Sequence, residues 1–274
     1  MKVKIKYIGM YLFLIIMAAV FALPMLFTLL SSLKTKVEIF SDPFSFPDVI
    51  QWGNYLEAWT GANMSRYFIN SLLQAGATVI ILGLVASMAA FVLSRFSFKG
   101  NKLLMLFFML GMMVPMHTVL VPISYIIGKM NLTNNIPALV LVYTAFNLPF
   151  SIMVTSNFMQ GVNRSLEEAA LIDGATYFQI YYKVMLPLTV PALSTISIFN
   201  FLSAWNNILF PLLFINDKNL KPIALGLLNF NGERGSDHGP LMAAIIITVA
   251  VPMILYLLFQ EKVEGGLAAG AVKE

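Results

Sequence analysis

The sequence predicts an all-α polytopic membrane protein with six transmembrane helices, and two observations lead to this prediction. The chain has 274 residues, of which 59% are hydrophobic and only 11% are charged, and its mean hydropathy is +0.81. Soluble domains carry about 25% charged residues. The apolar residues also gather in long uninterrupted runs, and a bilayer core needs about 20 of them per helix. A soluble globular domain is therefore excluded.

Six apolar runs are long enough to cross a bilayer, and we treat residues 1–274 as a single transmembrane domain that contains them. The first run is too long for a signal-peptide core and lacks a small-residue cleavage site, which predicts an uncleaved helix. Prolines inside the runs or at their ends predict kinks. The spans are residues 7–30, 68–93, 103–127, 136–156, 188–214 and 241–260, and the prolines are Pro24, Pro115, Pro122, Pro149, Pro191, Pro211 and Pro252.

Positive charge near the ends of the runs predicts the orientation of the chain. With the N-terminus inside, ten Lys and Arg residues lie on the inner side and seven on the outer side. The densest groups are Lys2, Lys4 and Lys6 in the N-terminal tail and Arg95, Lys99 and Lys102 in a short hairpin. Because such clusters stay in the cytoplasm, we expect both termini in the cytoplasm of a bacterial or archaeal cell, with the chain in the inner membrane.

The remaining composition excludes several function classes. The net charge of +4 is explained by these orienting residues, and no basic stripe indicates a nucleic-acid partner. Cysteine is absent, which excludes a disulfide frame and a thiolate metal site. No catalytic set and no metal-ligand spacing stands out, so we expect no enzyme activity, no metal and no cofactor.

Residues 163–187 interrupt the apolar sequence and cannot lie in hydrocarbon, because Glu167, Glu168, Asp173 and Lys183 would each cost several kcal/mol there. The local pattern predicts a cytoplasmic helix-turn-helix. Ser165 and Glu168 fit a capping box with Ser165 as the N-cap, and Gly174 suits the end of the first helix. A second helix follows over 176–185, and Pro187 begins the next span.

This segment has the composition of an interaction surface. Ala169 and Ala170 offer a small face that lets another surface come close, and an apolar group on a loop favours a protein partner over an ordinary well-capped loop. The large apolar side chains are Tyr177, Phe178, Ile180, Tyr181 and Tyr182.

The segment resembles the EAA loop of the permease subunits of binding-protein-dependent ABC importers. That loop reads Glu-Ala-Ala, three residues, Gly, nine residues, Ile, one residue, Leu-Pro. Here Glu168-Ala169-Ala170, Gly174 and Val184-Met185-Leu186-Pro187 stand at the same spacing, with valine in place of isoleucine. Further segments resemble carbohydrate-uptake permeases, in particular the smaller, six-helix permease of the pair in maltose transporters: residues 113–122, 131–135, 201–207 and 265–273.

The resemblance implies a type I ABC importer permease fold and a set of partners. These are a second, related permease subunit, two ATP-binding subunits, an extracytoplasmic solute-binding protein and a sugar of the di- or oligosaccharide class. The residues implied in ATPase coupling are Glu168, Ala169, Ala170, Asp173, Gly174 and Pro187. Those implied in contact with the binding protein are Asn229, Phe230, Asn231, Gly232 and Glu233.

Polar residues inside the spans are candidates for the translocation path. Asn200, Trp205, Asn206 and Asn207 combine amides with an aromatic ring, which suits sugar hydroxyls and ring faces. The competing interpretation is hydrogen bonding between helices, which we favour for His117 and Asn147.

The absence of a Gly-x4-Gly-Lys-Ser/Thr phosphate loop means that ATP hydrolysis requires a separate subunit. The leading interpretation is therefore a sugar importer permease driven through the Glu168–Gly174 segment. The alternatives are an ABC permease for another solute and an ion-coupled secondary carrier. A carrier would require a coupling-ion site at the midplane and an internal repeat, and the sequence has neither.

Overall fold

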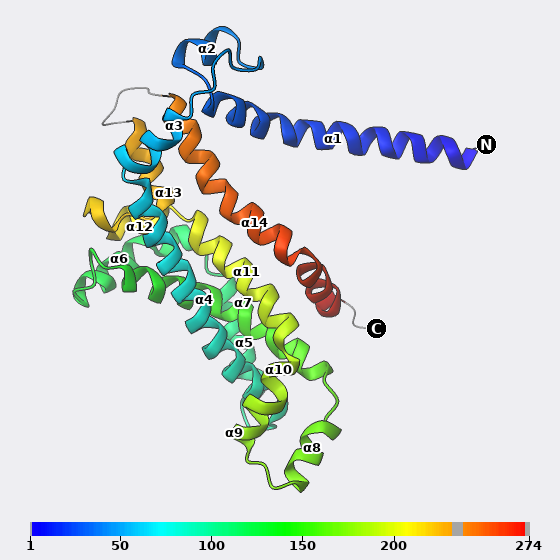
Figure 1. The fold of residues 1–274 in the computed structure, drawn as a ribbon. Helices are drawn as coiled ribbons and strands as arrows, with labels where there is room; N and C mark the ends of the chain where they lie inside the picture. Colours follow the sequence, from blue (N-terminus) through cyan, green and yellow to red (C-terminus); the bar gives the residue numbers. More distant parts are fainter. Residues whose placement is uncertain (1, 232–237, 272–274) are drawn as a thin grey trace. The chain divides into compact units, whose positions relative to one another are not determined.

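The computed structural model describes residues 2–231 and 238–271, which form helices and no β-strand (Figure 1). Four helices are long and apolar enough to cross a membrane: α1 (Lys2–Ser32), α4 (Met64–Arg95), α7 (Ile136–Gly161) and α14 (His238–Ala271). Two bent helix pairs raise the possible number of spans to six. The predicted all-α membrane fold is thereby confirmed.

The chain divides into two compact units, which are described separately. Unit 1 comprises residues 1–65 and 226–251, and unit 2 comprises residues 66–225 and 252–274. Besides α1 and the first part of α14, unit 1 contains the short elements α2 (Lys36–Ser41), α3 (Gly53–Leu56), η1 (Glu57–Gly61) and η5 (Leu227–Asn231).

A buried lysine organises the connection that follows α1 in unit 1. The side chain of Lys34 is fully buried, and its Nζ donates to the carbonyl oxygens of Asp42 (2.7 Å) and Pro43 (3.2 Å) and to Ser45 Oγ (3.2 Å). An ammonium group has three donors, so each of them finds an acceptor. The burial of this charge is compensated by the loop that it holds together.

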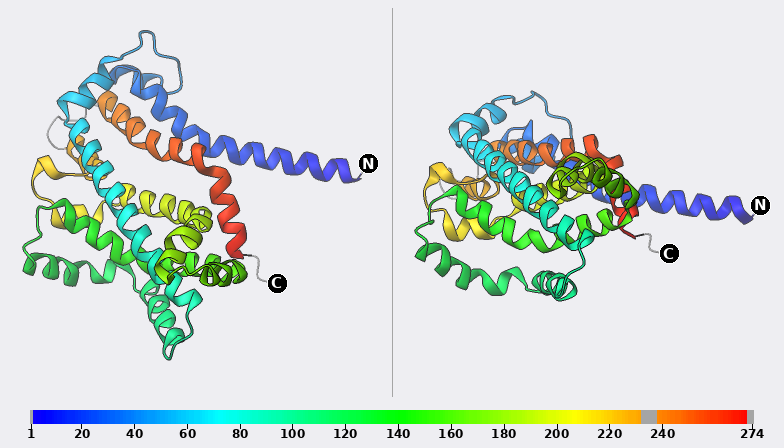
Figure 2. Two further views of the ribbon diagram at one scale, coloured as in Figure 1. Left: turned by 60° about the horizontal axis from the view of Figure 1, so that its bottom comes forward. Right: turned by 90° about the horizontal axis from the view of Figure 1, so that it is seen from below.

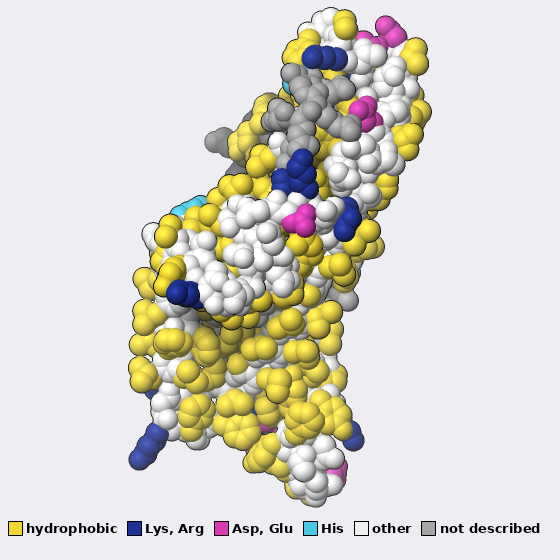
Figure 3. Space-filling model, turned by 90° about the vertical axis from the view of Figure 1, so that its left-hand side faces the viewer, with side chains coloured by type: hydrophobic (Ala, Val, Ile, Leu, Met, Phe, Trp, Pro, Cys, Tyr) yellow, Lys and Arg dark blue, Asp and Glu magenta, His cyan; other side chains and the backbone are white. Residues whose placement is uncertain are grey.

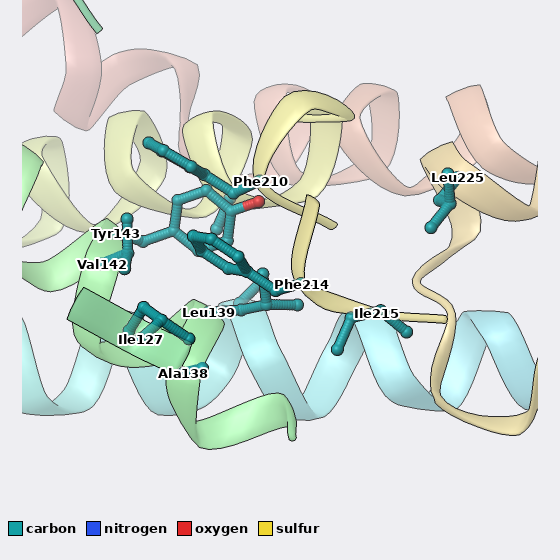
Figure 4. Close-up of a cluster of buried hydrophobic side chains, with 11 residues drawn as sticks. Ile127, Ala138, Leu139, Val142, Tyr143, Phe210, Phe214, Ile215 and Leu225 are labelled. Atoms are coloured by element: carbon teal, nitrogen blue, oxygen red, sulfur yellow. The ribbon is translucent and has the colours of Figure 1, made fainter. Parts of the chain in front are cut away.

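Unit 2 is built around α7. This helix packs against α5 (Asn101–Met112) and α11 (Val190–Asn206), as Figure 2 shows from two directions. The short helix α12 (Leu209–Phe214) packs against α7 and against α6 (Leu120–Lys129). A cluster of buried side chains joins these last three helices (Figure 4). In it the ring of Phe210 lies 5.7 Å from that of Tyr143 and stacks on that of Phe214 at 5.8 Å.

The distribution of polar and apolar side chains on α4 in unit 2 is that of a membrane helix. Most of its buried residues are small or polar, whereas most of its large aliphatic side chains, such as Ile69, Leu73, Ile80 and Leu84, are exposed. Hydrophobic side chains also cover much of the visible face of unit 2 in Figure 3. Small residues allow helices to approach closely in lipid. The small and polar residues among those buried on α4 are Asn70, Ser71, Gln74, Ala75, Thr78, Ala86, Ser87, Ala90 and Ser94.

The predicted third run, 103–127, is broken into two helices rather than kinked. α5 ends at Met112, a 3₁₀ turn η2 (Met116–Val119) leads into α6, and the two halves meet at 89°. Pro115 lies at the corner in an extended conformation (φ −66°, ψ 126°). A proline has no N–H for the helix ladder, and the residue before it avoids the helical region, which together account for a break at this point.

The start of the fifth span also differs from the prediction. The helical segment Tyr177–Leu188 runs through Pro187 and bends by 72° to α11 at Thr189. Pro187 lies in the first turn of the short helix α10, and Pro191 lies in the first turn of α11. Within the predicted run 188–214, the helix stops again at Asn207, and α12 begins at Leu209.

Candidate functional site

The segment that follows α7 folds into two short helices. These are α8 (Ser165–Ile172) and α9 (Tyr177–Ile180), which is continued by a π-helical turn, η3 (Tyr181–Met185), and by α10 (Leu186–Leu188). They occupy the lower end of unit 2 in Figure 1. The predicted helix-turn-helix is thus present as two short helices with a tight connection.

The connection between α8 and α9 is fixed by Gly174. This residue has φ +81°, a left-handed conformation that glycine adopts without steric cost. The Gly174 N–H donates to the Leu171 carbonyl (3.0 Å), and the Ala175 N–H donates to the Ala170 carbonyl (2.9 Å). These two bonds make a Schellman motif, so the predicted glycine stop is confirmed.

The predicted N-cap of α8 is wrong. Arg164, with helical φ −66°, is the N-cap and makes no side-chain cap hydrogen bond, and Ser165 is the first residue of the helix. Instead the Asn163 side chain accepts from the Ser165 N–H at 3.0 Å. The capping box lies eleven residues later, where Thr176 and Gln179 bond reciprocally to each other's backbone N–H at the start of α9.

The candidate coupling residues divide into outward and inward groups. Glu168, Ala169, Asp173, Gly174 and Pro187 are exposed. Ala170 is half-buried and packs against a buried cluster formed by Ala90, Phe91, Met159, Ile180, Tyr181 and Met185. The two alanines therefore do not form one outward face, because α8 turns Ala170 toward the bundle.

The predicted aromatic group is divided in the same way. Ile180 and Tyr181 are buried, and the Tyr181 hydroxyl shares a 2.8 Å hydrogen bond with Ser87 on α4. Phe178 is 65% exposed and Ile172 on α8 is 87% exposed. We use the name α8–α9 surface for the exposed side chains of Leu166, Glu168, Ala169, Leu171, Ile172, Asp173, Tyr177 and Phe178.

One contact of this segment joins it to α4 and could not be predicted from the sequence. Arg95, at the end of α4, forms an ion pair with Glu167 on α8 with an N–O distance of 2.7 Å. The two residues are 72 positions apart in the sequence, so no local pattern could join them.

The candidate path residues do not form one group. Asn200 and Trp205 are buried inside unit 2, where Asn200 Nδ2 donates to Ser151 Oγ (3.0 Å) and the ring of Trp205 lies against those of Phe68 and Phe201. Asn206 is exposed and Asn207 is half-buried at the break between α11 and α12. The four residues thus differ in exposure, and their role in a translocation path stays a prediction.

Two helix breaks meet at Asn207. Its Oδ1 accepts from the Phe210 N–H (3.2 Å) and so caps α12, while its Nδ2 lies 3.6 Å from the sulfur of Met116 in the η2 turn. His117, next to Met116, is exposed. The structure gives it no hydrogen bond to the described residues, whereas Asn147 exchanges hydrogen bonds with Ser203 on α11 at 3.3–3.4 Å. Helix packing is thus supported for Asn147 and not for His117.

The loop assigned to contact with the binding protein is described only in part. Phe230 is buried in unit 1. Gly232 and Glu233 lie outside the described residues, as do the side chains of Asn229 and Asn231. Among the described residues, no group of three or more His, Asp or Glu side chains could hold a metal ion.

Comparison with known proteins identifies the relatives of this chain. Residues 79–268 match the family described as "binding-protein-dependent transport system inner membrane component". The chain is 35% identical over 262 residues to the diacetylchitobiose uptake system permease protein NgcG of Streptomyces coelicolor, covering 95% of this chain and 87% of that protein. It is also 35% identical to the probable ABC transporter permease protein YurM of Bacillus subtilis, covering 97% and 90%.

A solved structure shares the fold. The chain is similar to a subunit of a bacterial ABC transporter involved in the import of the acidic polysaccharide alginate, with a TM-score of 0.85 at 20% identity over 94% of this chain and 96% of that one. The expected type I permease fold is thereby confirmed.

Proposed function

We propose that this chain, which belongs to the family of inner membrane components of binding-protein-dependent transport systems, is the permease subunit of an ATP-driven sugar importer. The observation that carries the proposal is the folding of the Glu168–Gly174 pattern into an exposed short helix, α8, that ends in a left-handed turn at Gly174. The chain is a transport component and not an enzyme.

A sugar is the solute that we favour. The relative named for diacetylchitobiose supports an oligosaccharide, since it matches 95% of this chain. The equally similar YurM carries no solute in its name, so a non-sugar solute is the second candidate. The ion-coupled carrier is set aside, because the family is that of binding-protein-dependent systems.

The α8–α9 surface is the proposed seat of an ATP-binding subunit. Ile172 and Phe178 present large apolar area beside the carboxylates of Glu168 and Asp173, at a place that lipid cannot cover. Such a patch beside charged residues marks a protein contact. We assign positioning to Ala170 and Gly174, which shape the surface, and assign contact to Glu168, Ala169, Asp173 and the exposed apolar residues. Pro187, which is exposed on α10, borders this region.

The remaining partners follow from this assignment. A second, related permease would complete the path, two ATP-binding subunits would supply the energy, and a binding protein would deliver the solute. The positive charge around the α4–α5 hairpin favours a cytoplasmic position for this end of unit 2 and for both termini.

The meeting point of the two helix breaks is the proposed section of the translocation path. Non-helical backbone at membrane depth is tolerated only where protein buries it or where it lines a water-filled cavity. Asn206 is exposed beside the break, and its amide can hydrogen bond to a sugar hydroxyl. Asn207 shapes the break, and Asn200 and Trp205 pack behind it.

We expect Asn206→Ala to change the uptake kinetics by roughly two- to tenfold, because one hydrogen bond contributes about 0.5–1.5 kcal/mol. Initial rates measured over a range of solute concentrations would give the change in KM and maximal rate. Asn157→Ala on α7, another exposed asparagine, is the matched control and should be silent. Identical uptake kinetics for both variants would mean that Asn206 does not contact the solute.

The experiment that tests the proposed function is reconstitution of the complete complex in proteoliposomes with solute-loaded binding protein. We expect uptake that requires ATP, and we expect Glu168→Lys to abolish it together with retention of the ATPase subunits, while the variant still inserts into the membrane. Uptake driven by an ion gradient without ATPase would refute the proposal. Uptake of an osmolyte in preference to any sugar would select the second candidate.

A further inference from the structure

Arg95 differs from the other basic residues at its end of the bundle. Lys99 and Lys102, in the same hairpin, are exposed, as expected for residues that orient the chain. The Arg95 side chain is only 3% exposed. Burial of a guanidinium group is costly unless its charge and its donors are satisfied, and a lysine or arginine in water would serve orientation equally well.

The charge of Arg95 is paired, and one of its terminal nitrogens is hydrogen bonded, whereas its Nε and Glu167 Oε1 make an ion pair without hydrogen-bond geometry. Its Nε lies 2.7 Å from Glu167 Oε1, in an ion pair whose acidic partner is 15% exposed. Its Nη2 donates to the Val162 carbonyl at 2.9 Å and lies 3.7 Å from the sulfur of Met185. The planar fork of arginine provides donors in several fixed directions at once, which a lysine cannot do.

The three partners lie on three successive parts of the α8–α9 segment. Val162 is the C-cap of α7, Glu167 is in the first turn of α8, and Met185 is the last residue of η3. One side chain of α4 therefore holds both ends of the segment. The Ser87–Tyr181 hydrogen bond, two helical turns earlier on α4, adds a second buried link to η3.

We infer that Arg95 is a positioning residue for energy coupling: it fastens the α8–α9 segment to α4, so that a displacement of α8 moves α4 with it. This inference rests on the proposed function, since it presumes that an ATP-binding subunit pushes on the α8–α9 surface. Glu167 has a role distinct from that of its neighbour Glu168, because Glu167 is paired with Arg95 and Glu168 is exposed.

The functional test compares transport with ATP hydrolysis in the reconstituted complex. For Arg95→Gln and Glu167→Gln we expect uptake to fall roughly tenfold or more while stimulated ATP hydrolysis is largely retained, since loss of one partner leaves the other charge buried and unpaired. The ATP consumed per solute then rises. Arg95→Lys should be intermediate, and Lys99→Gln should match the unmodified chain. A parallel fall in uptake, hydrolysis and complex yield would reduce Arg95 to a structural role and overturn the inference.

A distance measurement tests the same inference without reference to transport. The chain contains no cysteine, so spin labels at Val92→Cys on α4 and Ser165→Cys on α8 report only on these two helices. We expect one narrow distance distribution that is the same with and without ATP, and a broadened distribution when Glu167→Gln is added. An unchanged distribution in that variant would overturn the inference. If the unmodified complex transports nothing, the proposed function fails, while the distances still decide the role of Arg95.

Discussion

Replacing Gly174 by valine should abolish most ATP-driven uptake without preventing membrane insertion. Gly174 has φ +81°, and no atom lies within 4 Å of a Cβ built on it, so the cost comes from the backbone alone. A left-handed conformation costs an L-residue about 1–2 kcal/mol, and a β-branched residue is a clear outlier there. The chain would relieve this strain by opening the Schellman motif, which would turn α8 away from α9 and divide the α8–α9 surface.

The expected reduction is roughly tenfold in the affinity of the complex for its ATPase subunits, since about 1.4 kcal/mol corresponds to a factor of ten. It can be measured as ATPase retained on the purified chain and as uptake in proteoliposomes. Gly174→Asn is the informative rescue, because asparagine tolerates this conformation. Gly161→Val, at the end of α7 where the backbone is not left-handed and space is open, controls for added bulk. If Gly174→Val retained its ATPase fully, the shape of this turn would not matter for docking.

The caps of this segment show how far local sequence can predict structure. Ser165–Glu168 and Thr176–Gln179 both match the capping-box pattern, yet only the second forms a box. In the first pattern, the Asn163 side chain accepts from the Ser165 N–H, and Ser165 lies inside the helix and not at the N-cap. Gly174 could be predicted because a left-handed helix end depends on one residue and its neighbours. The Arg95–Glu167 pair could not, because it depends on how α4 and α8 pack.

Composition predicts the apolar runs for a similar reason, since the bilayer thickness fixes their length. It does not predict which side chains of a run are buried. Trp205 and Asn206 are adjacent, but the ring lies inside unit 2 between aromatic neighbours and the amide lies outside. Composition also does not predict the size of a bend. All seven prolines suggested kinks, but the sequence did not indicate that the helix would bend by 89° at Pro115, which has an extended conformation.

Phe178→Asp should prevent docking of the ATP-binding subunit. Phe178 is 65% exposed on α9, and its ring stands 5.4 Å from that of Tyr182. Burial of such a side chain against a partner contributes about 1.5–3 kcal/mol. An aspartate at this position would lose that contribution and would also bring an unpaired carboxylate into the interface, where its desolvation opposes binding.

The result should be a complex that loses its ATPase during purification and shows no uptake, with normal membrane insertion because the exposed Phe178 side chain is not part of a buried cluster. Phe178→Leu retains an apolar side chain and should keep most of the activity. Phe98→Asp places the same charge on another exposed phenylalanine, in the α4–α5 hairpin outside the α8–α9 surface, and should be silent. Equal loss in Phe98→Asp would mean that any charge at this end of unit 2 is harmful. This result would contradict the assignment of the α8–α9 surface as the docking site.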